Sequence, residues 1–171
     1  MKATAIAHPN IALSKYWGKQ ERSGNYPATP SLSVTLSGLA TETTVEYSDS
    51  FPADSIFLAG KPAGAAFAKR AGEMLSRIRT KAPTPFAKVD TSNDFPTASG
   101  LASSASGFAA LATACAAAAG LNWNQEMLSD LARQSSASAA RSIYGGFVEL
   151  AAEPNAEMLA AQEIAPFNHM D

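Results

Sequence analysis

The chain has 171 residues, 46% hydrophobic and 16% charged, a composition that can bury a core and does not resemble disordered protein. Its 13 basic and 15 acidic residues give a net charge of −2, without the basic stripe that nucleic-acid-binding proteins usually carry. The single cysteine, Cys115, excludes an intrachain disulfide and fits a reduced, cytoplasmic setting.

Strands are predicted mainly in the first 60 residues. A small apolar strand over residues 3–7 is expected to end at His8. Residues 31–39 alternate between apolar and polar side chains, which is typical of a half-buried strand. Residues 41–47 are rich in β-branched side chains and are predicted to pair with that strand as a hairpin. A shorter strand over residues 55–58 and a turn at residues 60–62 complete this block.

Helices dominate the prediction after residue 65. Apolar residues recur at helical spacing from 67 to 78, with basic residues toward the other face, which predicts an amphipathic helix that stops near Pro83. After a strand over residues 86–91, an Ala-rich helix is predicted over residues 100–119, closed by Gly120. The remaining predictions are a helix through Leu131 capped by Asn122 or Asn124, and a strand over residues 147–151.

The order of these elements favours an α+β fold. There is no regular strand–helix–strand repeat, so a parallel doubly wound sheet is disfavoured. The length fits one domain, or one domain with a fragment of a second. Residues 95–125 carry no charged side chain, but their most apolar part, 108–121, is shorter than the roughly 20 residues that span a bilayer. A buried helix is therefore predicted in preference to a membrane segment.

A run of small and hydroxyl-bearing residues, 96–105, joins the predicted strand at 86–91 to the Ala-rich helix. Free N–H groups and the helix dipole make a helix N-terminus an anion site, and small side chains let a phosphate approach the backbone closely. No Gly-Lys-Ser/Thr follows, so the run is not a Walker A motif. Tight packing of a small-residue helix against a sheet would explain the composition equally well.

A second segment places two lysines, a tyrosine and a tryptophan within five residues, 15–19. Two cations and a phenol can hold a multiply charged phosphate ester. A surface lysine pair beside a core tryptophan is the alternative, and the segment taken alone favours that alternative.

A third segment surrounds Arg141 with four serines, at positions 135, 136, 138 and 142. The arginine side chain suits two-pronged binding of a carboxylate or a phosphate. The alternative is a solvated helix end. Because this density of serine is unfavourable inside a helix, a ligand role is favoured.

Taken together, these segments resemble the mevalonate diphosphate decarboxylases of the GHMP kinase superfamily. The matching stretches keep the family's order and spacing between residue 3 and about residue 150. They are residues 9–12, 15–19, 31–36, 95–98, 100–105 and 141–149.

The resemblance implies a ribosomal-protein-S5-domain-2-like fold, with residues 1–171 forming the N-terminal ATP-binding domain and the family's C-terminal domain absent from this chain. It implies ATP and Mg²⁺ as cosubstrates, with the metal ligands unknown. The family phosphorylates the 3-hydroxyl of mevalonate diphosphate, and phosphate and carbon dioxide then leave to give isopentenyl diphosphate. A tertiary hydroxyl is a poor leaving group until it is phosphorylated, and cations must hold the two polyanions together.

The resemblance also assigns roles to individual residues. The catalytic set is Asn10, Lys15, Ser104 and Arg141. The residues that hold mevalonate diphosphate are Tyr16, Lys19, Ser136, Ser138 and Arg141. The residues along ATP are Ser92, Asn93, Gly100, Leu101, Ala102, Ser103, Ser104 and Ser106.

The chain departs from the family pattern in the serine segment. The family usually has glycine at positions 135 and 137, where this chain has Ser135 and Ala137, and often has cysteine in place of Ala140. If the second glycine adopts a positive φ, Ala137 would strain the loop. A kinase or decarboxylase acting on mevalonate or its 5-phosphate is therefore one alternative function. A non-catalytic S5-like binding domain is another.

The resemblance places the family's catalytic aspartate in the half that this chain lacks. The chain alone is therefore expected to have an incomplete site. Association with a C-terminal half, or a homodimer, is the expected assembly, and neither nucleic acid nor a membrane is an expected partner.

Overall fold

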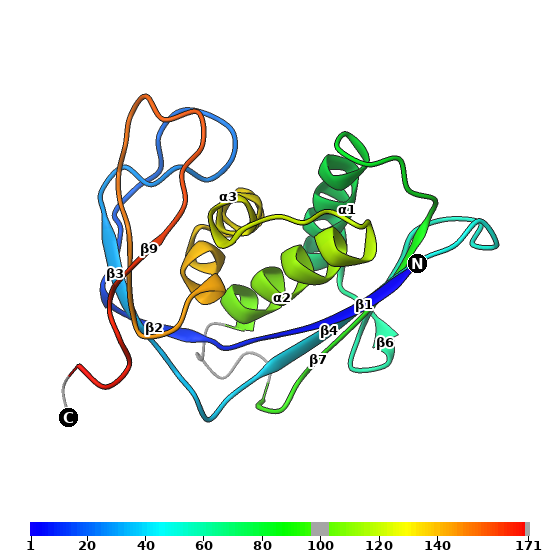
Figure 1. The fold of residues 1–171 in the computed structure, drawn as a ribbon, viewed down its shortest axis with the longest axis horizontal. Helices are drawn as coiled ribbons and strands as arrows, with labels where there is room; N and C mark the ends of the chain where they lie inside the picture. The colour runs from blue at the N-terminus through cyan, green and yellow to red at the C-terminus, as the bar shows by residue number, and fades with distance from the viewer. Residues whose placement is uncertain (97–102, 170–171) are drawn as a thin grey trace.

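Two β-sheets stand at an angle to each other and enclose a group of helices, in a computed structural model that describes residues 1–96 and 103–169 (Figure 1). The first sheet has the order β1-β4-β7-β5-β6 and the second has the order β2-β3-β8-β9. The strands are β1 Lys2–Ala7, β2 Asn10–Ser14, β3 Ser31–Thr35, β4 Thr41–Tyr47, β5 Ser55–Leu58, β6 Lys61–Pro62, β7 Ala87–Asn93, β8 Phe147–Leu150 and β9 Gln162–Ala165.

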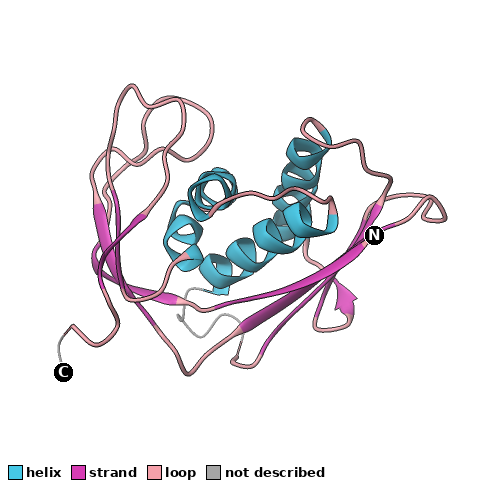
Figure 2. Ribbon diagram, in the orientation of Figure 1, coloured by secondary structure: helices cyan, strands magenta, loops and turns pink. Residues whose placement is uncertain are grey.

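Helices α1 Ala65–Arg79, α2 Ser103–Ala118 and α3 Gln125–Ser135 lie on one face of the first sheet, and the 3₁₀ helix η1 Ala137–Ile143 follows α3 toward the second sheet (Figure 2). The α+β prediction is confirmed. All pairs in the first sheet are antiparallel except β5 with β7, which makes the sheet mixed.

The predicted hairpin between residues 31–39 and 41–47 is wrong. Strand β4 pairs with β1 and β7, whereas β3 pairs with β2 and β8 in the other sheet. The reason lies in the inward row of β4, where Thr41, Thr43, Val45 and Tyr47 are all buried. That row packs with the helical layer of the first sheet, so β4 gains core contacts that a hairpin with β3 would not provide.

Helix α2 forms the centre of the core. It is apolar around its whole circumference, and Phe108, Leu111 and Cys115 have no exposed surface. Its alanines let α1 and the strands approach closely, and Val89 and Leu75 belong to the same buried cluster. The buried-helix prediction is confirmed. Within the described residues, no helix is long and apolar enough to cross a membrane.

The turn from α2 to α3 is fixed by local capping, as predicted. Gly120 has a φ of 74°. Its N–H donates to the carbonyl of Ala117, and the N–H of Leu121 donates to the carbonyl of Ala116, each at a distance of 3.0 Å. The side chain of Asn124 then accepts a 2.9 Å hydrogen bond from the N–H of Met127. These caps direct α3 back across the helical layer, so that its C-terminal end leads into η1.

Candidate active site

A pocket of about 500 Å³ opens where the start of β2 and the loop after it meet η1. Five of its seven lining residues belong to the predicted site, and the other two are neighbours on β2. The lining residues are Asn10, Ile11, Ala12, Lys15, Tyr16, Ser138 and Arg141. The fold thus brings the N-terminal basic segment and the serine–arginine segment together, although more than 100 residues separate them.

Arg141 is the buried cation of this pocket, with 2% of its surface exposed. Its Nε donates to Ser33 Oγ at 2.9 Å, and its Nη1 donates to Ser31 Oγ at 2.5 Å. Its Nη2 donates to Asn10 Oδ1 at the longer distance of 3.4 Å. All three acceptors are neutral, and within the described residues no carboxylate forms an ion pair with Arg141. Burial lowers the pKa of Arg141, because a desolvated charge without a counter-ion is unfavourable.

The two serines that hold Arg141 lie on the buried face of β3. Ser31 and Ser33 are 2% and 0% exposed, whereas Leu32 and Val34 on the opposite face are only half-buried. The predicted alternation is confirmed, but the more buried row is the polar one. It turns inward because its hydroxyls accept hydrogen bonds from the guanidinium. The sequence signals for these two residues are the alternation and the family match over residues 31–36, and neither assigned them a role.

Asn10 connects β2 to η1. It is 3% exposed, and its Nδ2 donates to the carbonyl of Ser138 over 3.1 Å and to Ser142 Oγ over 2.7 Å. Its amide oxygen Oδ1 faces Nη2 of Arg141 at a distance of 3.4 Å. The amide therefore fixes the position of η1 against the second sheet, beside the buried Arg141.

The basic segment after β2 is exposed. Lys15 and the half-buried Tyr16 line the pocket, whereas Lys19 donates from Nζ to Asn25 Oδ1 over 2.6 Å and is not among the lining residues. Trp17 is 80% exposed, so the alternative of a core tryptophan is wrong. Two unburied lysines beside a buried arginine leave this end of the molecule able to attract anions.

The serine segment forms the junction of α3 and η1. The hydroxyls of Ser136 and Ser138 lie 3.2 Å apart, and Ser135 Oγ is buried without a hydrogen-bond partner in the described structure. The strain anticipated at Ala137 is not found. In the described part of the chain, the non-glycine residues with positive φ are Asn25 and Ala59, so Ala137 does not need the freedom of glycine.

The predicted ATP residues fall in three places. Ser103 and Ser104 form the half-buried first turn of α2, which carries no acidic residue. Ser92 and Asn93 lie at the end of β7 and line a second hollow of about 290 Å³. Gly100, Leu101 and Ala102 lie outside the described residues.

Ser106 does not fit its predicted role in binding ATP. It has no exposed surface, and its Oγ lies 2.6 Å from Thr41 Oγ1, which in turn donates to Asn93 Oδ1 over 2.6 Å. Two positions along a helix correspond to a rotation of about 200°, so Ser106 and Ser104 point to nearly opposite sides of α2. Ser106 therefore anchors the start of α2 to β4 and β7.

The sequence and the fold are similar to those of known proteins. Residues 7–161 match the family model described as the diphosphomevalonate decarboxylase-like N-terminal domain. The chain belongs to this family. It is 41% identical over 182 residues to the diphosphomevalonate decarboxylase of Candida albicans, a match that covers 98% of this chain and 50% of that protein.

Solved structures of the diphosphomevalonate decarboxylase family share the fold. The mevalonate diphosphate decarboxylase from Enterococcus faecalis is 45% identical, with a TM-score of 0.88 over 96% of this chain and 51% of that one. A structure of MDDEF in complex with MVAPP, AMPPCP and magnesium is 44% identical, also with a TM-score of 0.88, over 96% of this chain and 50% of that one. The chain thus spans about half the length of the relatives it matches.

Proposed function

We propose that this chain supplies the substrate-binding and nucleotide-phosphate-binding half of an ATP-dependent decarboxylase that converts mevalonate 5-diphosphate into isopentenyl diphosphate. The observation that carries the proposal is Arg141, a buried guanidinium with neutral partners that opens on a pocket shared with Lys15. A buried cation of this kind is unfavourable until an anion binds beside it. Membership of the diphosphomevalonate decarboxylase family supports the identity of that anion.

In the proposed complex, Arg141 holds the carboxylate of mevalonate diphosphate, because the planar guanidinium binds carboxylates with two parallel hydrogen bonds. Lys15, Tyr16 and Ser138 line the same pocket and would hold the remaining polar groups of the substrate. Ser136 is within hydrogen-bond reach of Ser138 and would extend this hydroxyl row. Lys19 would join after leaving Asn25, since a lysine side chain rotates freely at an exposed position.

The residues at the start of α2 fit a nucleotide phosphate. The first turn of α2 carries the positive end of the helix dipole and the hydroxyls of Ser103 and Ser104, and it contains no acidic residue. ATP, when bound, would supply the phosphoryl group that turns the 3-hydroxyl of the substrate into a leaving group. Within the described residues, no group of three or more His, Cys, Asp or Glu side chains could hold a metal. Mg²⁺ would bind with ATP, and phosphate oxygens and water are ligands that it commonly keeps.

The relatives that support this proposal are about twice as long as the chain. We therefore infer that the complete active site includes an aspartate base from a C-terminal half, supplied in the same protein or by a partner. A homodimer is the second assembly to test. A cytoplasmic location is also part of the proposal, because both substrates are soluble polyanions.

The test combines the 171-residue chain with the separately produced C-terminal half of the Enterococcus faecalis relative, MgATP and mevalonate diphosphate. We expect ADP and carbon dioxide in equal amounts. ADP without carbon dioxide would favour a mevalonate-type kinase instead. If neither ADP nor carbon dioxide appears and calorimetry shows no binding of mevalonate diphosphate or MgATP to the chain, the non-catalytic alternative is favoured and the proposal is wrong.

A further inference from the structure

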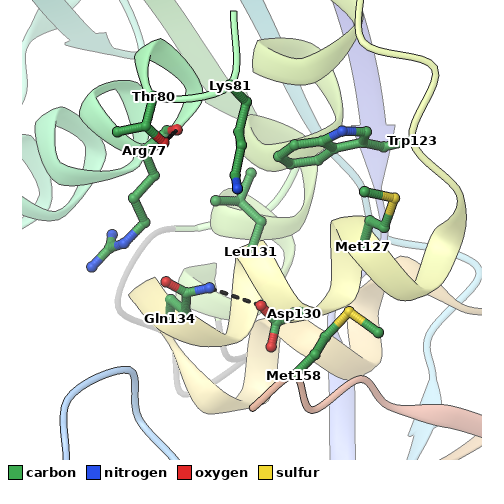
Figure 3. Close-up of a pocket in the computed structure, with 9 residues that line it drawn as sticks. All are labelled: Arg77, Thr80, Lys81, Trp123, Met127, Asp130, Leu131, Gln134 and Met158. Carbon is green, nitrogen blue, oxygen red and sulfur yellow. Dashed lines mark hydrogen bonds between the residues drawn. The ribbon is translucent and has the colours of Figure 1, made fainter.

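A separate pocket of about 390 Å³ lies between the C-terminal end of α1 and the helix α3 (Figure 3). It shares no lining residue with the pocket at Arg141. Its volume is within the range of small-molecule sites in proteins. The lining residues are Arg77, Thr80, Lys81, Trp123, Met127, Asp130, Leu131, Gln134 and Met158.

The apolar wall of this pocket comes from α3 and its surroundings. Leu131 is almost fully buried, whereas Met127 and Met158 are 41% and 51% exposed and lie on the side of Asp130 away from Gln134. The half-buried indole of Trp123 lies beside them (Figure 3). Two flexible, polarisable methionines beside an indole form a surface that adapts to a flat or branched apolar group.

The opposite wall carries two cations without anionic partners. The side chain of Lys81 extends from the end of α1 toward Leu131, between Arg77 and Trp123 (Figure 3). In the described structure, neither Lys81 nor Arg77 forms an ion pair. Nη1 of Arg77 is buried and has no hydrogen-bond partner there. The dipole of α1 favours cations at its C-terminal end, but it does not account for a buried guanidinium nitrogen that donates to nothing.

The one acid in the lining does not neutralise these cations. The carboxylate of Asp130 accepts from Arg133 Nη2 over 2.5 Å, from Gln134 Nε2 over 2.8 Å and from the N–H of Leu159 over 2.9 Å. Its charge is thus compensated within α3 and the segment between β8 and β9. The pocket is left with an apolar floor and a positive rim.

We propose that this pocket binds a small amphipathic anion, with an aromatic or branched apolar body against Trp123, Met127 and Met158 and a carboxylate or phosphate head at Lys81 and Arg77. The head would give Arg77 Nη1 the acceptor that it lacks. Because the two ends of the pocket differ in chemistry, the ligand requires both parts, and neither a simple anion nor a neutral apolar molecule satisfies it. The proposal is independent of the function proposed for the pocket at Arg141.

Trp123 provides the readout. The chain has two tryptophans, so Trp17→Phe leaves Trp123 as the sole tryptophan, which can be excited selectively over tyrosine, and Trp17 is exposed enough for this change to leave the fold intact. In this background we would titrate 4-phenylbutyrate and phenyl phosphate, with 4-phenylbutanamide, acetate and inorganic phosphate as controls. We expect saturable changes in emission with a Kd of roughly 0.1–1 mM for one or both aromatic anions, the range for ligands of this size. The two anions distinguish a carboxylate from a phosphate site.

Substitutions of residues in the pocket would show whether the ligand binds there. Lys81→Gln and Arg77→Gln should each weaken binding by about tenfold, the effect of losing one charged hydrogen bond. Lys69→Gln, an exposed lysine on the same helix, and Arg141→Gln, in the other pocket, should change the Kd less than twofold, with thermal melting confirming that each variant folds. The proposal is overturned if the neutral amide binds as well as the acid, or if Lys81→Gln leaves the Kd unchanged. It is also overturned if Trp123 emission changes with protein concentration alone, since a second copy would then fill the pocket.

Discussion

The Nε atom of Arg141 donates a 2.9 Å hydrogen bond to the hydroxyl of Ser33, 108 residues earlier in the chain. This bond and the one to Ser31 support a cation that has no anionic partner within the described residues. They fix the direction of the guanidinium without neutralising it. In the proposed function, this arrangement holds the cation in place for an anionic ligand, whose binding would offset part of the cost of burying the charge.

Replacing Arg141 should therefore separate binding from stability. In Arg141→Gln, we expect the affinity for mevalonate diphosphate to fall by about 10- to 100-fold, the effect of losing charged hydrogen bonds. The free energy of unfolding should change by only about 1 kcal/mol, because loss of an uncompensated buried charge offsets the lost hydrogen bonds. Calorimetry and urea denaturation of the same samples would measure the two quantities.

Arg79→Gln is the matched control. Arg79 donates to both carboxylate oxygens of Asp54, at distances of 2.9 and 2.6 Å, and neither residue lines the pocket at Arg141. This variant should lose about 1–3 kcal/mol of stability and keep its affinity for the substrate. The opposite pattern, with Arg141→Gln strongly destabilised and still able to bind, would contradict the role proposed for Arg141.

Two serines on α2 should respond differently to replacement by alanine. Ser104→Ala should weaken binding of MgATP by about 5- to 10-fold, since one hydroxyl at the phosphate is lost. Ser106→Ala should leave the affinity for MgATP within twofold, but it should destabilise the fold by about 1–2 kcal/mol, because Thr41 loses a buried partner. Equilibrium binding of a fluorescent ATP analogue, together with thermal melting, would test both. Equal effects of the two changes on nucleotide affinity would refute the assignment of Ser106 to the fold.

Two buried tyrosines should also differ when each is changed to phenylalanine. The hydroxyl of Tyr26 donates to the carbonyl of Glu157 over 2.6 Å, so Tyr26→Phe should cost about 1 kcal/mol. The hydroxyl of Tyr47 is buried beside the thiol of Cys115, which is only a weak hydrogen-bond partner, so Tyr47→Phe should cost less than Tyr26→Phe or be neutral. Urea denaturation would rank the two variants. A larger loss in Tyr47→Phe would show that its hydroxyl has a stronger partner, such as a buried water.

Local signals in the sequence predicted the parts of the fold that depend on neighbouring residues. The cap at Gly120 and the cap at Asn124 both involve hydrogen bonds to residues within five positions, so residue type and spacing suffice to find them. The length and apolar character of α2 likewise predict its burial. Five of the seven residues that line the pocket at Arg141 were also predicted from the sequence. The family resemblance made this possible, because it assigned residues 15–19 and Arg141 to the same site.

Contacts between distant segments of the chain could not be predicted from the sequence. The partner of a strand depends on contacts made elsewhere, so the alternation in β3 and β4 could not show that they lie in different sheets. The inward turn of Ser31 and Ser33 depends on Arg141, more than 100 residues away. The second pocket could not be predicted either, because Lys81 and Trp123 come from segments that show no shared pattern until α1 and α3 pack together.

The thiol of Cys115 provides a test of core burial through pH. Burial raises the pKa of this thiol from its ordinary value of 9.0 to about 12, because the thiolate would be desolvated. Between these two values the unfolded chain loses the proton and the folded chain keeps it. The folded state is then the one that binds more protons, so its stability falls as pH rises, by about 1.4 kcal/mol per pH unit for this group. Below pH 9 both states hold the proton and the thiol adds no pH dependence.

Cys115→Ala should remove this part of the alkaline destabilisation. At pH 7 we expect the variant to be about 1–2 kcal/mol less stable than the original chain, because a small cavity replaces the sulfur. From pH 9 to pH 10 the difference should shrink by about 1 kcal/mol, since only the original chain has a thiol to ionise on unfolding. Burial also raises the pKa of Tyr47, but from an ordinary value of 10.0, so its effect begins at higher pH. Urea denaturation at pH 7, 9 and 10 measures the difference. Parallel pH profiles for the two proteins would mean that the thiol ionises as readily in the folded core as in the unfolded chain, and that α2 is less tightly packed than the structure shows.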